Sequence, residues 1–210
     1  QLDIVHSFSW DGLVLYYNNF ICCLGGHAFV PGTQGYLCHW KLEQGMIVVL
    51  DIDLGNVGSI MNMLKKIGVP AVLASRCDEI EKAKKLILPG VGSFDQAMVN
   101  LSELKLIDVL NEKVTKEKIP VLGICLGAQI MTRSSEEGSR PGLGWIAGRT
   151  VRFDFRGEAC KLKIPHMGWN HVQLRKESAL LPQSAEPEDS RFYFVHAYHF
   201  LCDQEDDILA

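Results

Sequence analysis

The residue best suited to chemistry is Cys125, which lies within the segment 119–129, IPVLGICLGAQ. Residues 119–124 form an apolar run that is long enough for one buried strand of a parallel sheet. The chain then turns through G-I-C-L-G into a segment predicted to be helical as far as about Arg133. This is the strand–turn–helix context of a nucleophile elbow, G-x-S-x-G, with sulfur in place of oxygen.

A thiol at this position would have neighbours suited to nucleophilic catalysis. The free N–H groups of a helix N-terminus favour a thiolate, so the pattern predicts an activated Cys125. The same amides, beginning with that of Leu126, could hold an oxyanion. A lone cysteine is more often a buried structural residue, and this reading stays open here, although Gly123 and Gly127 favour the elbow.

Composition narrows the function classes. The chain has 210 residues, 47% of them hydrophobic and 22% charged, which predicts one globular domain with a sizeable core. The net charge of −4 gives no electrostatic case for nucleic acid or a membrane surface, and no apolar run approaches the ~18 residues of a membrane helix. The seven cysteines lack metal-ligand spacing, so we expect no metal, no cofactor and a cytoplasmic location.

Residues 1–45 differ from the rest of the chain. They are rich in aromatic residues and cysteine, carry almost no charge, and show no sustained period of 2 or 3.6. We interpret them as an N-terminal extension of unclear role, with the natural start at Met46 and the functional domain at 46–210. The spacing of potential ligands in this extension is too irregular for zinc: His6, Cys22, Cys23, His27, Cys38 and His39.

From Met46 the pattern predicts an α/β fold with a mostly parallel central sheet and flanking helices. Strands are predicted at 46–50, 71–74, 86–88 and 119–124, and helices from Asn56 to Ile67, from Ser93, and at 104–118. The C-terminal third predicts a smaller antiparallel β portion, with strands at 151–155, 161–164, 171–174 and 192–198. In parallel sheets, function gathers at the carboxyl ends of strands, where both the 89–92 segment and Cys125 lie.

Five motifs occur in order: PGVGSFDQAM at 89–98, PVLGICLGAQ at 120–129, EGSRPGLGWI at 137–146, IPHMGWN at 164–170 and RFYFVHAYH at 191–199. Together they resemble the class I glutamine amidotransferases, which have a flavodoxin-like fold. Within that group they are most similar to the glutaminase subunit of imidazole glycerol phosphate synthase. The resemblance implies a heterodimer in which glutamine is hydrolysed to glutamate. Ammonia then passes to a (β/α)₈-barrel synthase that makes imidazole glycerol phosphate and aminoimidazole carboxamide ribotide in histidine biosynthesis.

The resemblance also assigns roles to single residues. Cys125 matches the nucleophile, which would form a γ-glutamyl thioester. The backbone N–H of Leu126 matches one half of the oxyanion hole, and an oxyanion strand expected to reorient matches Gly90, Val91 and Gly92. Substrate-binding positions correspond to Gln129, Glu137, His196 and Tyr198. Positions that face the synthase subunit correspond to Trp169 and Tyr193.

The chain departs from the family at two places. The early family motif D-Y-G-x-G-N is DIDLGN here, with Ile52 and Asp53 in place of Tyr and Gly. The family's catalytic base is the His of an H-P-E motif, which the printed sequence does not contain, so we interpret the chain as cut short at its C-terminus. The histidines near the motifs are expected to line the pocket or pack and not to act as the base: His166, His171, His196 and His199.

Three other interpretations remain open. The same glutaminase chemistry could supply a nucleotide-sugar amidotransferase in surface polysaccharide biosynthesis. A cysteine peptidase on a similar fold usually has a histidine directly after its nucleophile, whereas this chain has Leu126. The chain could also be truncated and non-catalytic.

Overall fold

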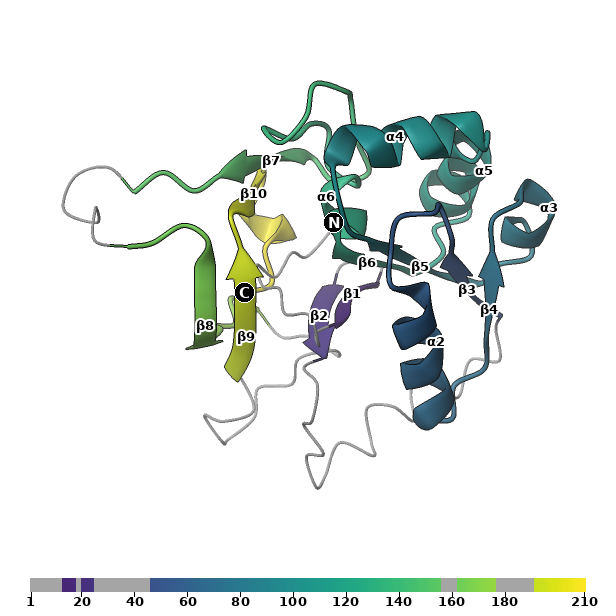
Figure 1. The fold of residues 1–210 in the computed structure, drawn as a ribbon, viewed down its shortest axis with the longest axis horizontal. Helices are drawn as coiled ribbons and strands as arrows, with labels where there is room; N and C mark the ends of the chain where they lie inside the picture. Colours follow the sequence, from purple (N-terminus) through teal and green to yellow (C-terminus); the bar gives the residue numbers. More distant parts are fainter. Residues whose placement is uncertain (1–12, 18–19, 25–45, 156–161, 177–190) are drawn as a thin grey trace.

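The computed structural model describes residues 13–17, 20–24, 46–155, 162–176 and 191–210 (Figure 1). Its centre is a parallel sheet of four strands in the order β4-β3-β5-β6. The strands are β3 (Ile47–Leu50), β4 (Ala71–Ala74), β5 (Lys85–Gly90) and β6 (Val121–Cys125). The predicted parallel α/β sheet is therefore confirmed.

Helices cover both faces of this sheet. Figure 1 shows α2 (Val57–Lys66) on one face and α4 (Phe94–Glu103) with α5 (Ile107–Asn111) on the other. Every residue of β3 and β5 is buried, which explains why 47–50 and 86–90 are continuous apolar runs and do not alternate. By contrast, β4 forms one edge of the sheet, and Val72 and Leu73 on it are exposed.

Both predicted helix starts have the expected side-chain caps. The side-chain oxygen of Asn56 accepts a hydrogen bond from the Ser59 N–H at 3.2 Å. The hydroxyl of Ser93 likewise accepts from the Gln96 N–H at 3.2 Å. These caps satisfy backbone donors that have no partner inside a helix, and they explain where α2 and α4 begin.

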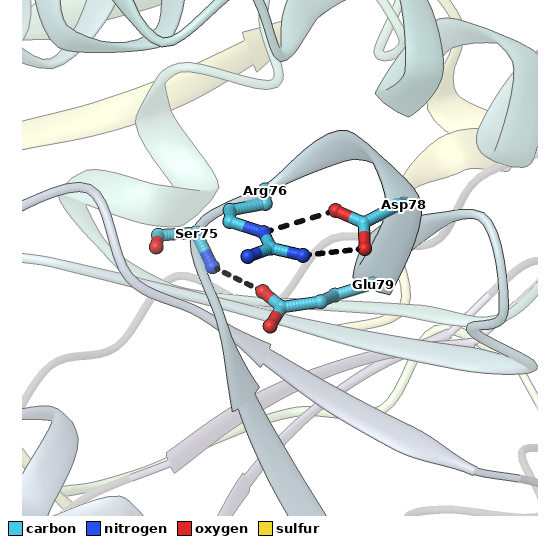
Figure 2. A network of polar contacts seen from close by, with 4 residues as sticks. All are labelled: Ser75, Arg76, Asp78 and Glu79. Carbon is cyan, nitrogen blue, oxygen red and sulfur yellow. Dashed lines mark hydrogen bonds and ion pairs between the residues drawn. The ribbon is translucent and has the colours of Figure 1, made fainter.

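A short helix, α3 (Cys77–Ile80), follows β4 and is tied to the turn before it by a surface network (Figure 2). The Arg76 guanidinium donates to both carboxylate oxygens of Asp78, at 3.0 and 2.6 Å. The Glu79 carboxylate accepts from the Ser75 N–H at 3.3 Å. Because Arg76 and Asp78 lie at the surface, their ion pair shapes the turn more than it stabilises the fold.

The C-terminal third contains the expected antiparallel strands. Strand β7 (Gly148–Arg152) pairs with β10 (Tyr198–Cys202), and β8 (His166–His171) pairs with β9 (Arg191–His196). The chain passes from β9 to β10 through a single bend at Ala197. The predicted strand 192–198 is thus two strands that belong to different two-stranded sheets.

Four other predicted elements differ from the structure. The predicted strand 151–155 is displaced, because β7 runs from Gly148 to Arg152. The described part of the predicted strand 161–164 is not a strand; Pro165, which has no N–H to donate to a neighbouring strand, stands directly before β8. The predicted strand 171–174 is displaced, since β8 begins at His166. The predicted helix 104–118 is α5 followed by a π-helical turn, Glu112–Lys116, in which buried Lys113 donates to the Glu81 carbonyl at 2.9 Å.

Part of the predicted N-terminal extension forms a hairpin. Strand β1 (Leu13–Tyr17) pairs antiparallel with β2 (Phe20–Leu24), and β1 contacts β6. The rest of 1–45 lies outside the described residues, as do the potential metal ligands His6, His27, Cys38 and His39, whereas Cys22 and Cys23 lie in β2. The division into an extension and a domain at 46–210 stays a prediction. Among the described helices, none is long and apolar enough to cross a membrane.

The packing of the sheet predicts that shortening two leucines to alanine has very different effects on the free energy of unfolding. Leu86→Ala on β5 removes a completely buried side chain and should lower the free energy of unfolding by about 2–5 kcal/mol. Leu73→Ala on β4, where the side chain is 43% exposed, should change it by about 0.5 kcal/mol or less. Urea unfolding followed by circular dichroism measures both, and equal losses would contradict the sheet order.

Candidate active site

The backbone at Cys125 is strained. This residue ends β6 and is the N-cap of α6 (Leu126–Gln129), with φ +55° and ψ −118°. Residues other than glycine avoid positive φ, and such conformations persist only where the surrounding structure imposes them. The sharp strand-to-helix turn predicted from G-I-C-L-G is confirmed, and it projects the thiol at the carboxyl end of the sheet.

Two glycines make this turn possible. A Cβ atom on Gly123 would lie 2.5 Å from the Cα of Ala128, and one on Gly127 would lie 1.7 Å from the carbonyl oxygen of Leu88. Both distances are far below van der Waals contact, and the obstructing atoms are backbone. Only glycine at these two positions lets α6 pack directly on β5 and β6.

Helix α6 ends earlier than the predicted limit at Arg133. The carbonyls of Ile130 and Met131 accept hydrogen bonds from the N–H groups of Leu143 and Ile146, at 2.7 and 2.9 Å. Thr132 also folds back, and its hydroxyl donates to the Gln129 carbonyl at 2.8 Å. These long-range partners replace the hydrogen bonds of another helical turn, so the helix has four residues.

The thiol is not activated in the way that the helix N-terminus predicts. Burial raises the pKa of Cys125 to about 11; the N–H of Leu126 opposes this shift, and the nearby Glu137 carboxylate adds to it. The prediction of a favoured thiolate was wrong, because a four-residue helix contributes little dipole and the loss of water dominates. Within the described residues, no histidine hydrogen-bonds to the thiol.

The predicted oxyanion residues lie beside the elbow. Gly90 is the partner of Cys125 in the pairing of β5 with β6. A Cβ atom on Gly90 would lie 2.9 Å from the Gly127 nitrogen, so the two backbones are in close contact. Beyond Gly90 the chain becomes exposed at Val91 and takes φ +105° at Gly92, a conformation suited to glycine.

Two of the predicted substrate residues also lie near Cys125. Gln129 follows it by one helical turn, and its side-chain oxygen is buried without a hydrogen-bond partner in the part of the chain that the structure describes. Glu137 acts electrostatically on the thiol, and desolvation raises the pKa of its own carboxyl group. A buried acceptor and a carboxylate thus lie beside the elbow.

Asp95 holds the loop after Glu137, a role that the sequence reasoning missed. Its carboxylate accepts hydrogen bonds from the N–H groups of Arg140 and Ser139, each at 2.9 Å, and from the Ser139 hydroxyl at 3.0 Å. These bonds hold the pKa of Asp95 below its usual range. The available signal was an acidic residue inside a capping box, which by itself indicates only a helix start.

The remaining predicted residues lie in the β8–β9 and β7–β10 sheets. Trp169 is 55% exposed, and its ring makes an edge contact with Tyr193, the residue opposite it, with centroids 5.5 Å apart. His196 hydrogen-bonds to His166 and to the carbonyl of Tyr198. None of these side chains hydrogen-bonds to Cys125 in the described residues, so the structure places them in a second group.

The departure from the early family motif is accommodated locally. Asp53 takes φ +58° and donates its N–H to the Asp51 carboxylate at 3.1 Å. Aspartate is one of the few residues that adopt this left-handed conformation readily, so it can replace glycine there. Ile52 is 2% exposed and packs in the core.

Comparison with known proteins decides the family. The family model described as "Glutamine amidotransferase class-I" matches residues 48–206. The chain belongs to this family. A structure described as "Crystal structure of glutamine amidotransferase" superposes with a TM-score of 0.57 at 20% identity, covering 79% of this chain and 83% of that one, and shows the same fold. The chain is therefore an enzyme of the glutamine amidotransferase type.

Curated relatives carry a narrower name. Those named "Imidazole glycerol phosphate synthase subunit HisH 2" from Methanococcus maripaludis and Pseudomonas aeruginosa are 52% and 49% identical, each alignment covering 78% of this chain and 79% of the relative. "Imidazole glycerol phosphate synthase subunit HisH" from Bacillus velezensis is 46% identical, over 79% of this chain and 77% of the relative. The chain is similar to these proteins over most of its length.

The packing of the elbow predicts opposite effects for two glycine substitutions. Gly127→Ala forces α6 away from the Leu88 carbonyl and should lower the free energy of unfolding by about 1–3 kcal/mol. Gly58→Ala on α2, where an added Cβ meets nothing within 4 Å, should raise it by about 0.5–1 kcal/mol. Urea unfolding of the two variants measures the difference. A stable Gly127→Ala protein would contradict the elbow geometry.

The pKa of Cys125 predicts how its alkylation depends on pH. Because that pKa is about 11, the thiolate fraction and the iodoacetamide reaction rate should rise about tenfold per pH unit from pH 7 to pH 10. Mass spectrometry of the Cys125 peptide follows the rate. Glu137→Gln should increase it at any one pH, since the carboxylate raises the thiol pKa. A plateau near pH 8.5 in the unmodified chain would show that burial does not control this thiol.

Proposed function

We propose that this chain is the glutaminase subunit of an imidazole glycerol phosphate synthase. It hydrolyses glutamine and delivers ammonia to a (β/α)₈-barrel synthase subunit in histidine biosynthesis, in the cytoplasm. The observation that carries the proposal is the strained elbow at Cys125, with the Gly90 strand packed against it. The names of the curated relatives support the choice of pathway.

In the proposed reaction the sulfur of Cys125 attacks the side-chain amide carbon of glutamine. Negative charge develops on the amide oxygen, where the N–H of Leu126 and a peptide N–H of 90–92 would stabilise it. The C–N bond then breaks as the nitrogen takes up the proton that the thiol gave to the base, so ammonia leaves, and water hydrolyses the γ-glutamyl thioester to glutamate. Because the pKa of Cys125 is about 11, attack requires a base that takes the thiol proton as the substrate binds.

Gln129 and Glu137 would hold the amino-acid end of the substrate. The side-chain oxygen of Gln129 is buried and unpaired in the described residues, and such an acceptor gains from a donor supplied by a ligand. The α-ammonium group of glutamine is a donor of that kind. The carboxylate of Glu137 offers the same group a charged partner.

The partner surface is proposed on β8. Met167 and Trp169 are 60% and 55% exposed, and the Trp169 ring rests on Tyr193. Exposed aromatic and methionine side chains of this size are enriched in protein–protein interfaces. We assign this face to the synthase subunit, which fits the roles that the family resemblance implies for Trp169 and Tyr193.

The alternative with a nucleotide-sugar amidotransferase as partner uses the same site. The departure at Ile52 and Asp53 leaves room for this partner, but the structure accommodates both residues locally, with Ile52 buried and Asp53 at φ +58°. The relatives named above instead carry the name of imidazole glycerol phosphate synthase. A non-catalytic chain remains the outcome that an activity assay must exclude.

Glutamate release in the presence of a (β/α)₈-barrel synthase subunit tests this proposal. Cys125→Ala should abolish the activity, and Gln129→Leu should raise KM about three- to tenfold, the effect of one lost hydrogen bond. Cys77→Ala, on α3, is the matched control and should leave both kinetic constants unchanged. An active Cys125→Ala protein would refute the nucleophile, and an inactive unmodified complex would favour the non-catalytic interpretation.

A further inference from the structure

One carboxylate ties the loop that carries Glu137 to the start of α4. Asp95 lies in the first turn of that helix, and its Oδ1 accepts hydrogen bonds from the N–H groups of Ser139 and Arg140, each at 2.9 Å. Its Oδ2 accepts from the Ser139 hydroxyl at 3.0 Å. Hydrogen bonds to a charged acceptor are stronger than neutral ones, so Asp95 fixes the backbone that follows Gly138.

Gly138 makes room for this carboxylate. A Cβ atom at that position would lie 2.2 Å from Oδ1 and 2.9 Å from Cγ of Asp95. Any other residue would therefore push the carboxylate out from under the loop. The hydrogen bonds of Asp95 thus depend on a glycine that stands directly after Glu137.

The position of the Glu137 side chain depends on this stretch of backbone. The N–H of Glu137 donates to the Ser135 hydroxyl at 3.1 Å, whereas the carboxylate of Glu136 accepts from the Arg152 N–H on β7 at 2.8 Å. In the part of the chain that the structure describes, the Glu137 carboxylate forms no hydrogen bond or ion pair. The backbone on either side of Glu137 therefore determines where this carboxylate lies.

The first turn of α4 adjoins both halves of the site. Gly92 ends the segment that begins beside Cys125, and only Ser93 and Phe94 separate it from Asp95. Glu137 is close enough to the elbow for its charge to act on the thiol: burial raises the pKa of Cys125 to about 11, and the Glu137 carboxylate adds to this shift. Asp95 thus connects the strand beside the elbow to the loop that supplies the neighbouring carboxylate.

We propose that Asp95 is a positioning residue for glutamine binding. By holding the backbone of Ser139 and Arg140, it keeps the Glu137 carboxylate at a fixed distance from Cys125, where it can meet the α-ammonium group of the substrate. Gly138 is the second part of this device, because its missing side chain lets Asp95 reach the loop. The role in glutamine binding rests on the proposed function; the positioning of Glu137 does not.

Alkylation of Cys125 by iodoacetamide in the full chain reports the position of Glu137 without any substrate. Asp95→Ala frees the loop, so the rate at pH 8 should rise toward that of Glu137→Gln. Asp95→Ala combined with Glu137→Gln should react at about the rate of Glu137→Gln alone, because both changes remove the same effect on the thiol. Gly138→Ala displaces Asp95 but keeps both carboxylates, and it should match Asp95→Ala.

Two results of this experiment would overturn the positioning. An Asp95→Ala protein that reacts at the unmodified rate would show that Glu137 keeps its place without the hydrogen bonds of Asp95. A double variant that reacts several times faster than Glu137→Gln would show that the freed loop merely exposes the thiol.

Asp95→Asn separates the hydrogen bonds of this residue from its charge. The amide oxygen of asparagine can accept from both N–H groups, and its nitrogen can donate to the Ser139 hydroxyl oxygen. The loop should therefore stay in place, with an alkylation rate equal to that of the unmodified chain. Asp78→Asn, in the surface network of α3, is the matched control and should change nothing. An Asp95→Asn protein as fast as Asp95→Ala would assign the effect to charge alone and overturn the proposal.

Glutamine kinetics of the complex test the role in binding. Asp95→Ala should raise KM about three- to tenfold with kcat changed less than about twofold, because a displaced Glu137 weakens binding and not bond breaking. Asp95→Asn should restore KM. Equal KM values for the unmodified and Asp95→Ala complexes would overturn this role. An inactive unmodified complex would instead defeat the proposed function, and the alkylation rates would still decide whether Asp95 positions Glu137.

Discussion

The approach of α6 to β5 is the contact on which the site depends. The Gly127 backbone lies so close to the Leu88 carbonyl that no side chain fits between them, and the Gly123 backbone is also too close to Ala128 for a Cβ atom. With the helix held there, the chain has one residue in which to turn from strand to helix. That residue is Cys125, and its positive φ is the strain that this close packing maintains.

The same packing explains why the Cys125 thiol stays protonated near neutral pH in this structure. Cys125 is partly buried, and this desolvation raises the pKa of its thiol to about 11; the neighbouring Glu137 adds to the shift. Close packing therefore positions the Cys125 thiol. Its deprotonation requires a base once the substrate has bound. Such an arrangement protects a thiol that would otherwise react with unrelated electrophiles at neutral pH.

The parallel half of the fold could be predicted because its signals are local. Buried strands such as β3 and β5 are short apolar runs, and the caps at Asn56 and Ser93 mark helix starts within four residues. The elbow was predictable for the same reason, since two glycines around one cysteine leave few conformations. The assigned family then follows from motifs within these local elements.

The features that could not be predicted depend on contacts between residues that are distant in the sequence. The end of α6 is determined by hydrogen bonds from residues 143–146, and the split between β9 and β10 by pairing with two different strands. The role of Asp95 requires a loop more than forty residues away, and the pKa of Cys125 requires its burial. Periodicity carries none of this information, because it describes a segment and not what packs against it.

Covalent labelling by a diazoketone analogue of glutamine, with the synthase subunit present, tests whether the elbow presents the Cys125 thiol to the substrate. We expect one added analogue on the Cys125 peptide, located by mass spectrometry, with labelling suppressed by excess glutamine and absent from Cys125→Ser. Labelling that falls instead on Cys77 or Cys202, or that glutamine does not suppress, would show that the elbow does not present this thiol to the substrate.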